Sequence, residues 1–199
     1  MSNAAPRLIL ASRSPRRAEL LSRLGLAHQV QHADVDESIL QGEQPHAAAG
    51  RLARLKASAA VESGALTIGC DTLVVHRGDI LGKPGDRREA KEMVCRLQGD
   101  EHVVFTGVAV ATADRVESVV ESTRVWFRRL DARECEEYAA TQEPMDKAGA
   151  YGIQGFGAAI VERIEGDYFN VMGLPIQRLL DLFRLFGWRY AFGALVELD

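Results

Sequence analysis

The amino-acid sequence predicts an α/β protein with a mixed central sheet flanked by helices. Short apolar or alternating segments typical of strands interleave along the chain with amphipathic segments typical of helices. Most of the helical segments open at a proline or an acidic capping residue and stop at a glycine. Two pairs of strand segments are separated only by short turns, so part of the sheet is expected to be antiparallel.

The first third of the chain predicts two strand–helix pairs. An apolar strand over 8–11 precedes a helix that begins at Ser14-Pro15 and ends at Gly25, because serine caps helices and proline suits their first turn. A weaker strand over 28–35 precedes an alanine-rich helix over 45–64, which opens at a proline and stops at a glycine.

The middle of the chain contains the clearest central strand. It covers 66–75 and is apolar on both faces apart from Asp71 and Thr72, as expected for a strand inside a sheet. A turn leads to a short partner strand over 80–81. A helix is expected over 86–99, because its first residues carry an acidic capping pattern and its last is a glycine.

The second half of the chain predicts two long strands over 102–112 and 116–128, whose alternation is consistent with an antiparallel pair. The remaining elements are expected to be a helix from Asp131, a glycine-dense loop over 149–157, a strand over 158–164 and a helix over 175–187. Residues 188–199 are a tail without an assigned element. No firm boundary is expected inside a single domain of 1–199.

Charge and composition exclude several classes of protein. The chain has 24 Lys and Arg against 28 Asp and Glu, a net charge of −4, which argues against a nucleic-acid surface. No apolar run approaches the ~20 residues of a membrane helix. Segment 1–10 lacks the charged flank and apolar length of a secretory signal. The sequence therefore predicts a cytoplasmic protein with no nucleic-acid or membrane partner.

The segment Ser12-Arg13-Ser14-Pro15-Arg16-Arg17 predicts a phosphate site. Two arginines in the first turn of a helix oppose its macrodipole by up to about 1 kcal/mol, so a bound anion would offset an unfavourable arrangement. The predicted donors are Ser12, Ser14, Arg16 and Arg17. Alternatively, the arginines face solvent or pair with Glu19 and the acidic segment near Glu37.

Asp71 is the second unusual residue, because an unpaired carboxylate inside an apolar strand is costly. It is expected at the strand's end, hydrogen-bonded, or on a metal. Glu37 would supply a second oxygen for a hard cation such as Mg²⁺, which takes few protein carboxylates when a substrate provides phosphates. The structural alternatives are an aspartate bonded to turn amides and a solvated glutamate.

Two lysines and one glutamine complete the candidate residues. Lys83, in the stiff Gly82-Lys83-Pro84 turn, and Lys56, in an alanine-rich helix, are placed to neutralise phosphates unless they are ordinary surface lysines. Gln154, in the glycine-dense loop, carries a donor and an acceptor that complement the edge of uracil or thymine; it would instead pair with backbone in a purely structural loop. Neither a P-loop nor a dinucleotide-binding motif is present.

Taken together, these motifs resemble the Maf family of nucleoside triphosphate pyrophosphatases. The segments that carry the resemblance are 12–21, 71–75, 82–84, 146–155 and 173–175. The resemblance implies a two-lobed α/β fold, Maf- or ITPase-like, with a substrate cleft across a central sheet. It also implies hydrolysis of dTTP and UTP at the α–β phosphoanhydride bond, with a divalent metal (Mg²⁺ or Mn²⁺).

The resemblance also implies roles for individual residues. Asp71 takes the role of catalytic acid or base, and Asp71 with Glu37 would hold the metal. The implied substrate-selecting positions are Arg16, Thr72 and Gln154, and the implied cleft-lining positions are Ser12, Arg17, Glu37, Lys56 and Lys83. A homodimer is implied as well. The alternative function is a nucleotide-binding regulator of septum formation or cell division that does not turn its ligand over.

Overall fold

The computed structural model describes residues 5–198. The first four residues of segment 1–10 and of the expected 1–199 domain lie outside the described residues, as does the last residue of the 188–199 tail. Within the described part of the chain, none of the helices has the length and apolar character needed to cross a membrane.

The chain divides into two compact units, and each is described by itself. The first unit holds the chain up to Asp71, Thr106–Glu121 and the chain from Gly173 onward. The second unit holds Thr72–Phe105 and Ser122–Met172.

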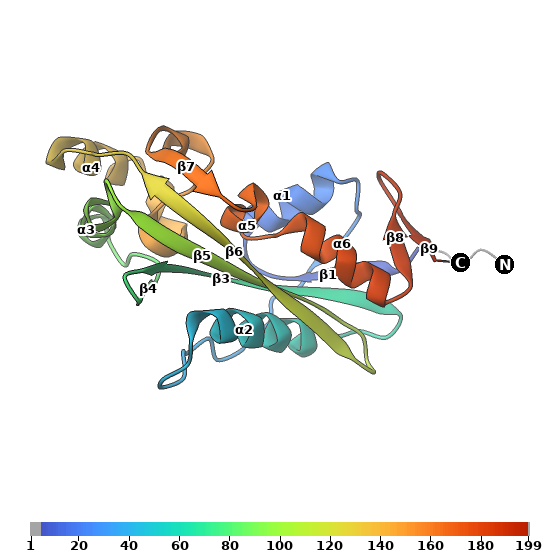
Figure 1. The fold of residues 1–199 in the computed structure, drawn as a ribbon. Coiled ribbons are helices and arrows are strands. Elements are labelled where there is room, and N and C mark those ends of the chain that lie inside the picture. The colour runs from blue at the N-terminus through green and yellow to red at the C-terminus, as the bar shows by residue number, and fades with distance from the viewer. Residues whose placement is uncertain (1–4, 199) are drawn as a thin grey trace. The chain divides into compact units, whose positions relative to one another are not determined.

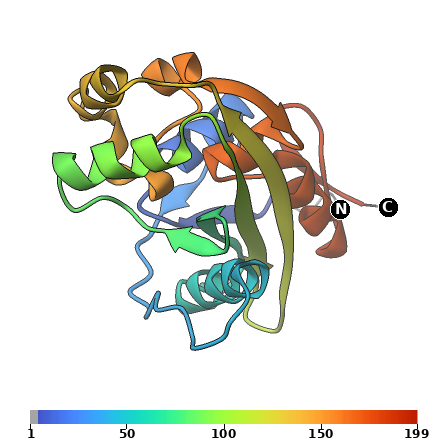
Figure 2. The same ribbon diagram turned by 60° about the vertical axis from the view of Figure 1, so that its left-hand side comes forward.

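Seven strands form a mixed sheet, in the order β2-β1-β3-β5-β6-β7 with β4 paired to β3 (Figure 1). The strands are β1 Arg7–Ala11, β2 Gln29–Val30, β3 Ala65–His76, β4 Asp79–Leu81, β5 Glu101–Ala111, β6 Val116–Phe127 and β7 Val161–Glu165. β1 runs parallel to β2 and β3, whereas β4 is antiparallel to β3 and β7 is antiparallel to β6. Figure 2 shows β5 and β6 side by side as a long hairpin. The predicted α/β class with a mixed sheet is confirmed.

The first unit has helices on both faces of its strands. They are α1 Pro15–Arg23, α2 Pro45–Ala59 and α6 Ile176–Leu185. In Figure 1, α2 covers one face, and α1 and α6 cover the other. Each begins next to a proline, and α1 and α2 therefore start where the sequence predicts.

Small side chains let α2 lie unusually close to the sheet. Its buried face is built from Ala48, Ala49, Leu52, Ala53, Lys56 and Ala57. A methyl group on Gly69 of β3 would lie 2.3 Å from the carbonyl oxygen of Ala53, and one on Gly107 of β5 would lie 2.1 Å from that of Ala49. Both positions therefore require glycine, and the backbones of α2 and β3 meet next to Asp71.

The second unit combines three α-helices with three short 3₁₀ helices. They are α3 Arg87–Leu97, α4 Ala132–Ala139, α5 Tyr168–Met172, η1 Glu143–Asp146, η2 Ala148–Ala150 and η3 Gly155–Ala159. α3 packs against α4. Asp86 caps α3 by accepting from the amide of Glu89, and Asp131 forms a reciprocal capping box with Glu134, which confirms both predicted starts.

Some element boundaries differ from the sequence predictions. The strand expected over 28–35 is only Gln29–Val30, because the following side chains are mostly polar and exposed and have no face to bury. The strand expected over 158–164 begins at Val161, because η3 occupies the residues before it. The short helix α5 was not predicted, since five residues are too few for a helical period to emerge.

The tail at 188–199, to which no element was assigned, contains an antiparallel hairpin. It is made of β8 Trp188–Tyr190 and β9 Leu195–Glu197. The hydroxyl of Tyr190 donates to the carbonyl of Leu24, 2.7 Å away, which ties the hairpin to the end of α1. The hairpin is therefore part of the first unit.

Candidate functional site

Asp71 is buried near the middle of β3, where it forms an ion pair with Lys56 of α2. The Lys56 Nζ atom lies 2.6 Å from Asp71 Oδ1, and only 9% of the Asp71 side chain and 11% of the Lys56 side chain are exposed. Residues two apart on a strand share a face, so Asp71 faces α2 as Gly69 does. The close approach at Gly69 thus brings the lysine of the helix to the aspartate of the strand.

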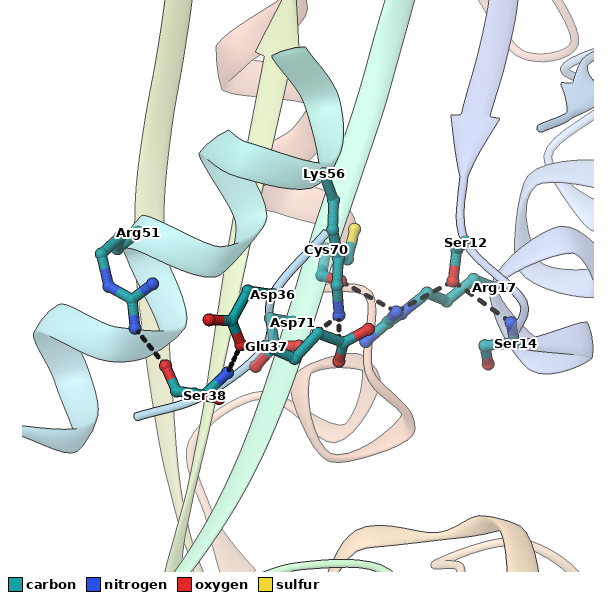
Figure 3. Close-up of polar contacts among 10 residues, drawn as sticks. All are labelled: Ser12, Ser14, Arg17, Asp36, Glu37, Ser38, Arg51, Lys56, Cys70 and Asp71. Atoms are coloured by element: carbon teal, nitrogen blue, oxygen red, sulfur yellow. Dashed lines mark hydrogen bonds and ion pairs between the residues drawn. The ribbon is translucent and has the colours of Figure 1, made fainter. Parts of the chain in front are cut away.

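The same ammonium also holds Glu37. Lys56 Nζ donates to Glu37 Oε2 at 2.8 Å, and 59% of the Glu37 side chain is exposed. Figure 3 shows Lys56 reaching from α2 between the two carboxylates. The predicted residues Glu37, Lys56 and Asp71 therefore meet in the first unit, although they are far apart in the sequence.

The segment that carries Glu37 is anchored to α2 by Arg51. The Arg51 guanidinium makes two hydrogen bonds of 2.7 Å to the carboxylate of Glu43 and one of 2.9 Å to the carbonyl of Ser38. The hydrogen bonds from Arg51 lower the pKa of Glu43. Ser38 in turn donates hydrogen bonds to Asp36, which lower the pKa of Asp36. One helix thus positions both Lys56 and the loop of its partner Glu37.

Arg17 fastens three parts of the first unit together. It is buried in α1, where Nη1 donates to Ser12 Oγ at 2.9 Å and to the carbonyl of Cys70 at 3.0 Å, and Nε donates to the carbonyl of Gly173 at 2.7 Å. Because Cys70 precedes Asp71, Arg17 fixes the strand beside the ion pair. Burial raises the pKa of the Cys70 thiol to about 11, so this thiol is protonated at neutral pH.

The start of α1 matches the predicted anion site in composition. Ser14 is the N-cap residue, but its side chain makes no capping bond among the described residues; its amide instead donates to Ser12 Oγ at 3.2 Å. Arg16 is half-buried in the first turn, and this turn contains no acidic residue. Phosphate binding by Ser14 and Arg16 stays a prediction.

The donor set of Asp71 and Glu37 fits a divalent metal. Asp71 Oδ2 is buried and has no hydrogen-bond partner in the described chain, and Glu37 offers a second, accessible carboxylate. Among residues 5–198, no group of three or more His, Cys, Asp or Glu side chains gathers closely enough to hold a metal by itself. Two carboxylates suit Mg²⁺, which completes its shell with water and substrate phosphates.

The remaining predicted residues belong to the second unit. Thr72 continues β3, Lys83 is exposed in the turn after β4, and Gln154 is half-buried just before η3. The amide of Gly149 donates to the carbonyl of Gly82 at 3.0 Å. The turn of Lys83 and the glycine-dense loop are therefore neighbours.

Sequence reasoning missed Arg51 and Glu143. Their side chains hold loops in place, and neither residue belongs to one of the recognised motifs. Arg51 occupies an ordinary helical position, and Glu143 precedes the glycine-dense loop by several residues. The carboxylate of Glu143 accepts three hydrogen bonds within the second unit. Neither residue carries a local signal, since their partners are backbone groups or side chains of other segments.

A family model described as "Maf-like protein" matches residues 7–186, from the first residue of β1 to the residue after the end of α6. The chain belongs to the Maf family. This confirms the resemblance inferred from the motifs, and every candidate residue lies inside the matched region.

Maf relatives cover most of the chain. A protein of Pelotomaculum thermopropionicum named "dTTP/UTP pyrophosphatase" is 48% identical over 185 residues, which are 91% of this chain and 97% of that protein. A protein of Moorella thermoacetica with the same name is 50% identical, over 91% of this chain and 95% of that protein. Among solved structures, the Ham1 protein of Staphylococcus aureus aligns with a TM-score of 0.44 and 14% identity, over 78% of this chain and 79% of that chain.

Proposed function

We propose that this chain hydrolyses dTTP and UTP to the nucleoside monophosphate and pyrophosphate. The names of the relatives support the substrates. The observation that carries the reaction is the state of Asp71: one buried oxygen is held by Lys56, and the other has no partner in the described chain. Lys56 fixes the position of this carboxylate, and its ionised form can accept a proton from water.

Asp71 acts as the general base in this proposal. The Asp71 carboxylate takes a proton from a water molecule as the water oxygen bonds to the α-phosphorus. The bond between the α-phosphorus and the oxygen bridging to the β-phosphorus breaks, and pyrophosphate leaves with that oxygen. Lys56 keeps the carboxylate in place. General-base catalysis supplies roughly 10²- to 10⁴-fold of rate.

Asp71 and Glu37 would hold a divalent cation, Mg²⁺ or Mn²⁺. When bound, the cation neutralises charge on the phosphate oxygens. Arg16, with the hydroxyls of Ser12 and Ser14, is proposed to bind phosphate oxygens at the start of α1. Arg17 keeps Ser12 and the Cys70 carbonyl in place, so its contribution includes the shape of the site.

Selection of the base is assigned to Gln154 and Thr72. The amide of Gln154 offers a donor and an acceptor to the O4 and N3–H edge of uracil or thymine. A site built around hydrogen bonds rejects a mismatched base because its polar groups are left unpaired. Three further points stay predictions: neutralisation of phosphates by Lys83, a homodimer, and a cytoplasmic location.

The test is pyrophosphate release from a panel of nucleoside triphosphates with added Mg²⁺ or Mn²⁺. We expect release from dTTP and UTP, its loss in EDTA, and its return with excess metal. Asp71→Asn should be inactive, whereas Asp114→Asn, the same change in the exposed turn after β5, should match the wild type. Nucleotide binding without pyrophosphate release would contradict the proposal and favour the regulator of septum formation.

A further inference from the structure

The carboxylate of Glu143 binds two amides of the glycine-dense loop in the second unit. Glu143, the first residue of η1, accepts hydrogen bonds of 2.9 Å from the Tyr138 hydroxyl, the amide of Phe156 and the amide of Gly157. The Tyr138 oxygen accepts in turn from the amide of Gly152, 3.3 Å away. The loop is therefore tied to α4 and η1 on both sides of Gln154.

The direction of the Tyr138 bond follows from its surroundings. Burial raises the pKa of Tyr138, so its hydroxyl remains protonated at neutral pH and donates to the carboxylate. Hydrogen bonds to an ionised carboxylate are stronger than those between neutral groups. Two of them come from the amides of Phe156 and Gly157, so Glu143 is a polar anchor of this segment.

The packing of the loop also explains two of its glycines. A methyl group on Gly155, whose φ is +62°, would lie 2.3 Å from Glu143 Oε2, and one on Gly157 would lie 1.8 Å from the carbonyl oxygen of Gly152. Both positions are closed to larger residues by the chain's own atoms. Gly155 therefore lets the loop pack against Glu143, and Gly157 lets it pack against the backbone of Gly152.

Gln154 lies between the anchored positions. Its backbone is extended, with φ −92° and ψ 171°, and the following residues begin η3. The side chain of Glu143 also blocks alternative paths for the loop, because it fills the space beside Gly155. A free segment would lose conformational entropy on binding a ligand, whereas an anchored segment has already lost it on folding.

We propose that Glu143, together with Tyr138, is a positioning residue for base selection: it fixes the loop so that the Gln154 amide meets a pyrimidine edge in one arrangement. This inference rests on the proposed function, because Glu143 would act by positioning the residue that the proposed function assigns to base selection. Glu143 touches neither the substrate nor the reacting atoms in this account. Its loss should alter discrimination and substrate binding more than turnover.

The experiment compares Glu143→Gln and Tyr138→Phe with the wild type. Glutamine keeps the size of Glu143 but replaces one acceptor oxygen with a donor, which opposes the amides of the loop. Phenylalanine removes only the hydroxyl and serves as the milder variant. Glu137→Gln is the matched control, since Glu137 is exposed on α4, where its carboxylate pairs with Arg133.

Two measurements separate positioning from a general structural effect. Amide hydrogen exchange of residues 152–157 should accelerate in both variants and not in the control. The ratio of kcat/KM for UTP to that for GTP should fall roughly 5- to 10-fold in Glu143→Gln, as expected for a net loss of about 1 kcal/mol or more, mainly through a higher KM for UTP. Tyr138→Phe should show a smaller change of the same kind.

Two kinds of failure are distinguishable. If wild-type protein is active and selective, but both variants keep its UTP-to-GTP ratio and loop exchange, the inference is overturned and the proposed function stands. A fall in kcat that is equal for every nucleotide also overturns it. If the wild type releases no pyrophosphate from UTP or dTTP, the proposed function fails and the inference falls with it.

Discussion

The ion-pair site of the first unit and the glycine-dense loop of the second unit are built in opposite ways. Asp71 and Lys56 stand on a strand and a helix whose backbones meet at Gly69, so regular structure sets their positions. Gln154 stands on irregular backbone, and the carboxylate of Glu143 holds the amides of Phe156 and Gly157 that follow it. The comparison teaches that the proposed chemistry rests on a rigid frame, whereas the proposed selection rests on a few side-chain bonds.

The largest expected effect comes from Asp71→Asn. The amide cannot accept the proton of the attacking water, so kcat should fall roughly 10²- to 10⁴-fold for every nucleotide hydrolysed. The protein should stay folded, because Lys56 keeps its bond to Glu37. Steady-state kinetics with UTP, dTTP and GTP measure the effect. A variant that stays active, or that loses activity toward one base only, would contradict the division between the two regions.

Lys56→Met should have the largest effect on stability. It leaves the buried Asp71 carboxylate without its cation, which costs on the order of 3 kcal/mol of the free energy of unfolding. Urea denaturation gives this value. The double variant Lys56→Met/Asp71→Asn should be more stable than Lys56→Met alone, since no buried charge remains. Equal stability of these two variants would mean that the ion pair does not govern the stability of the site.

The contrast between the regions also explains what the sequence could predict. Asp71 was found because a carboxylate breaks an apolar strand pattern, and α1 and α2 because proline and glycine mark their ends. The strand over 28–35 was predicted too long, because its alternating pattern was not matched by a buried face. The hairpin over 188–197 was missed, since two three-residue strands give almost no periodic signal.

The support of the loop could not be predicted for a related reason. Glu143 acts through the amides of Phe156 and Gly157, and backbone donors have no residue-specific signature in a sequence. Arg51 likewise acts partly through the carbonyl of Ser38. Residues that carry chemistry are recognised by type and spacing, whereas residues that hold loops become visible only when their distant partners are placed.

A pH measurement tests His102 of β5, a buried histidine that contacts Tyr151 of the glycine-dense loop. His102 lies 2.7 Å from the Tyr151 hydroxyl through Nε2 and packs edge-on against Tyr151 and Phe127. Burial lowers the pKa of His102 from 6.5 to about 3, so the folded protein keeps the ring neutral while the unfolded chain takes up a proton below pH 6.5. Stability should therefore fall as pH drops from 6.5 toward 3, by about 1.4 kcal/mol per pH unit from this group.

The control for this effect is His102→Gln. Between pH 6.5 and 4, the variant should take up one proton fewer than the wild type on unfolding, so its free energy of unfolding should depend less on pH. Above pH 7, the two proteins should have parallel curves. Urea titrations at a series of pH values supply both slopes. Identical slopes in the acid range would show that His102 is protonated in the folded protein.

The smallest expected effect is that of Gln154→Ala. It removes the proposed contact with the base but leaves the anchors of the loop, so the ratio of UTP to GTP hydrolysis should fall by roughly 2- to 10-fold, the equivalent of one hydrogen bond. Loop hydrogen exchange should not change, in contrast to Glu143→Gln. An unchanged UTP-to-GTP ratio would show that neither Gln154 nor its loop takes part in base selection.

The position of bond cleavage tests the central proposal most directly. Wild-type protein hydrolyses UTP in ¹⁸O-labelled water, and mass spectrometry locates the label in the products. Attack of an Asp71-activated water on the α-phosphorus predicts one ¹⁸O atom in UMP and none in pyrophosphate. Label in pyrophosphate, or products consisting of UDP and inorganic phosphate, would contradict the account.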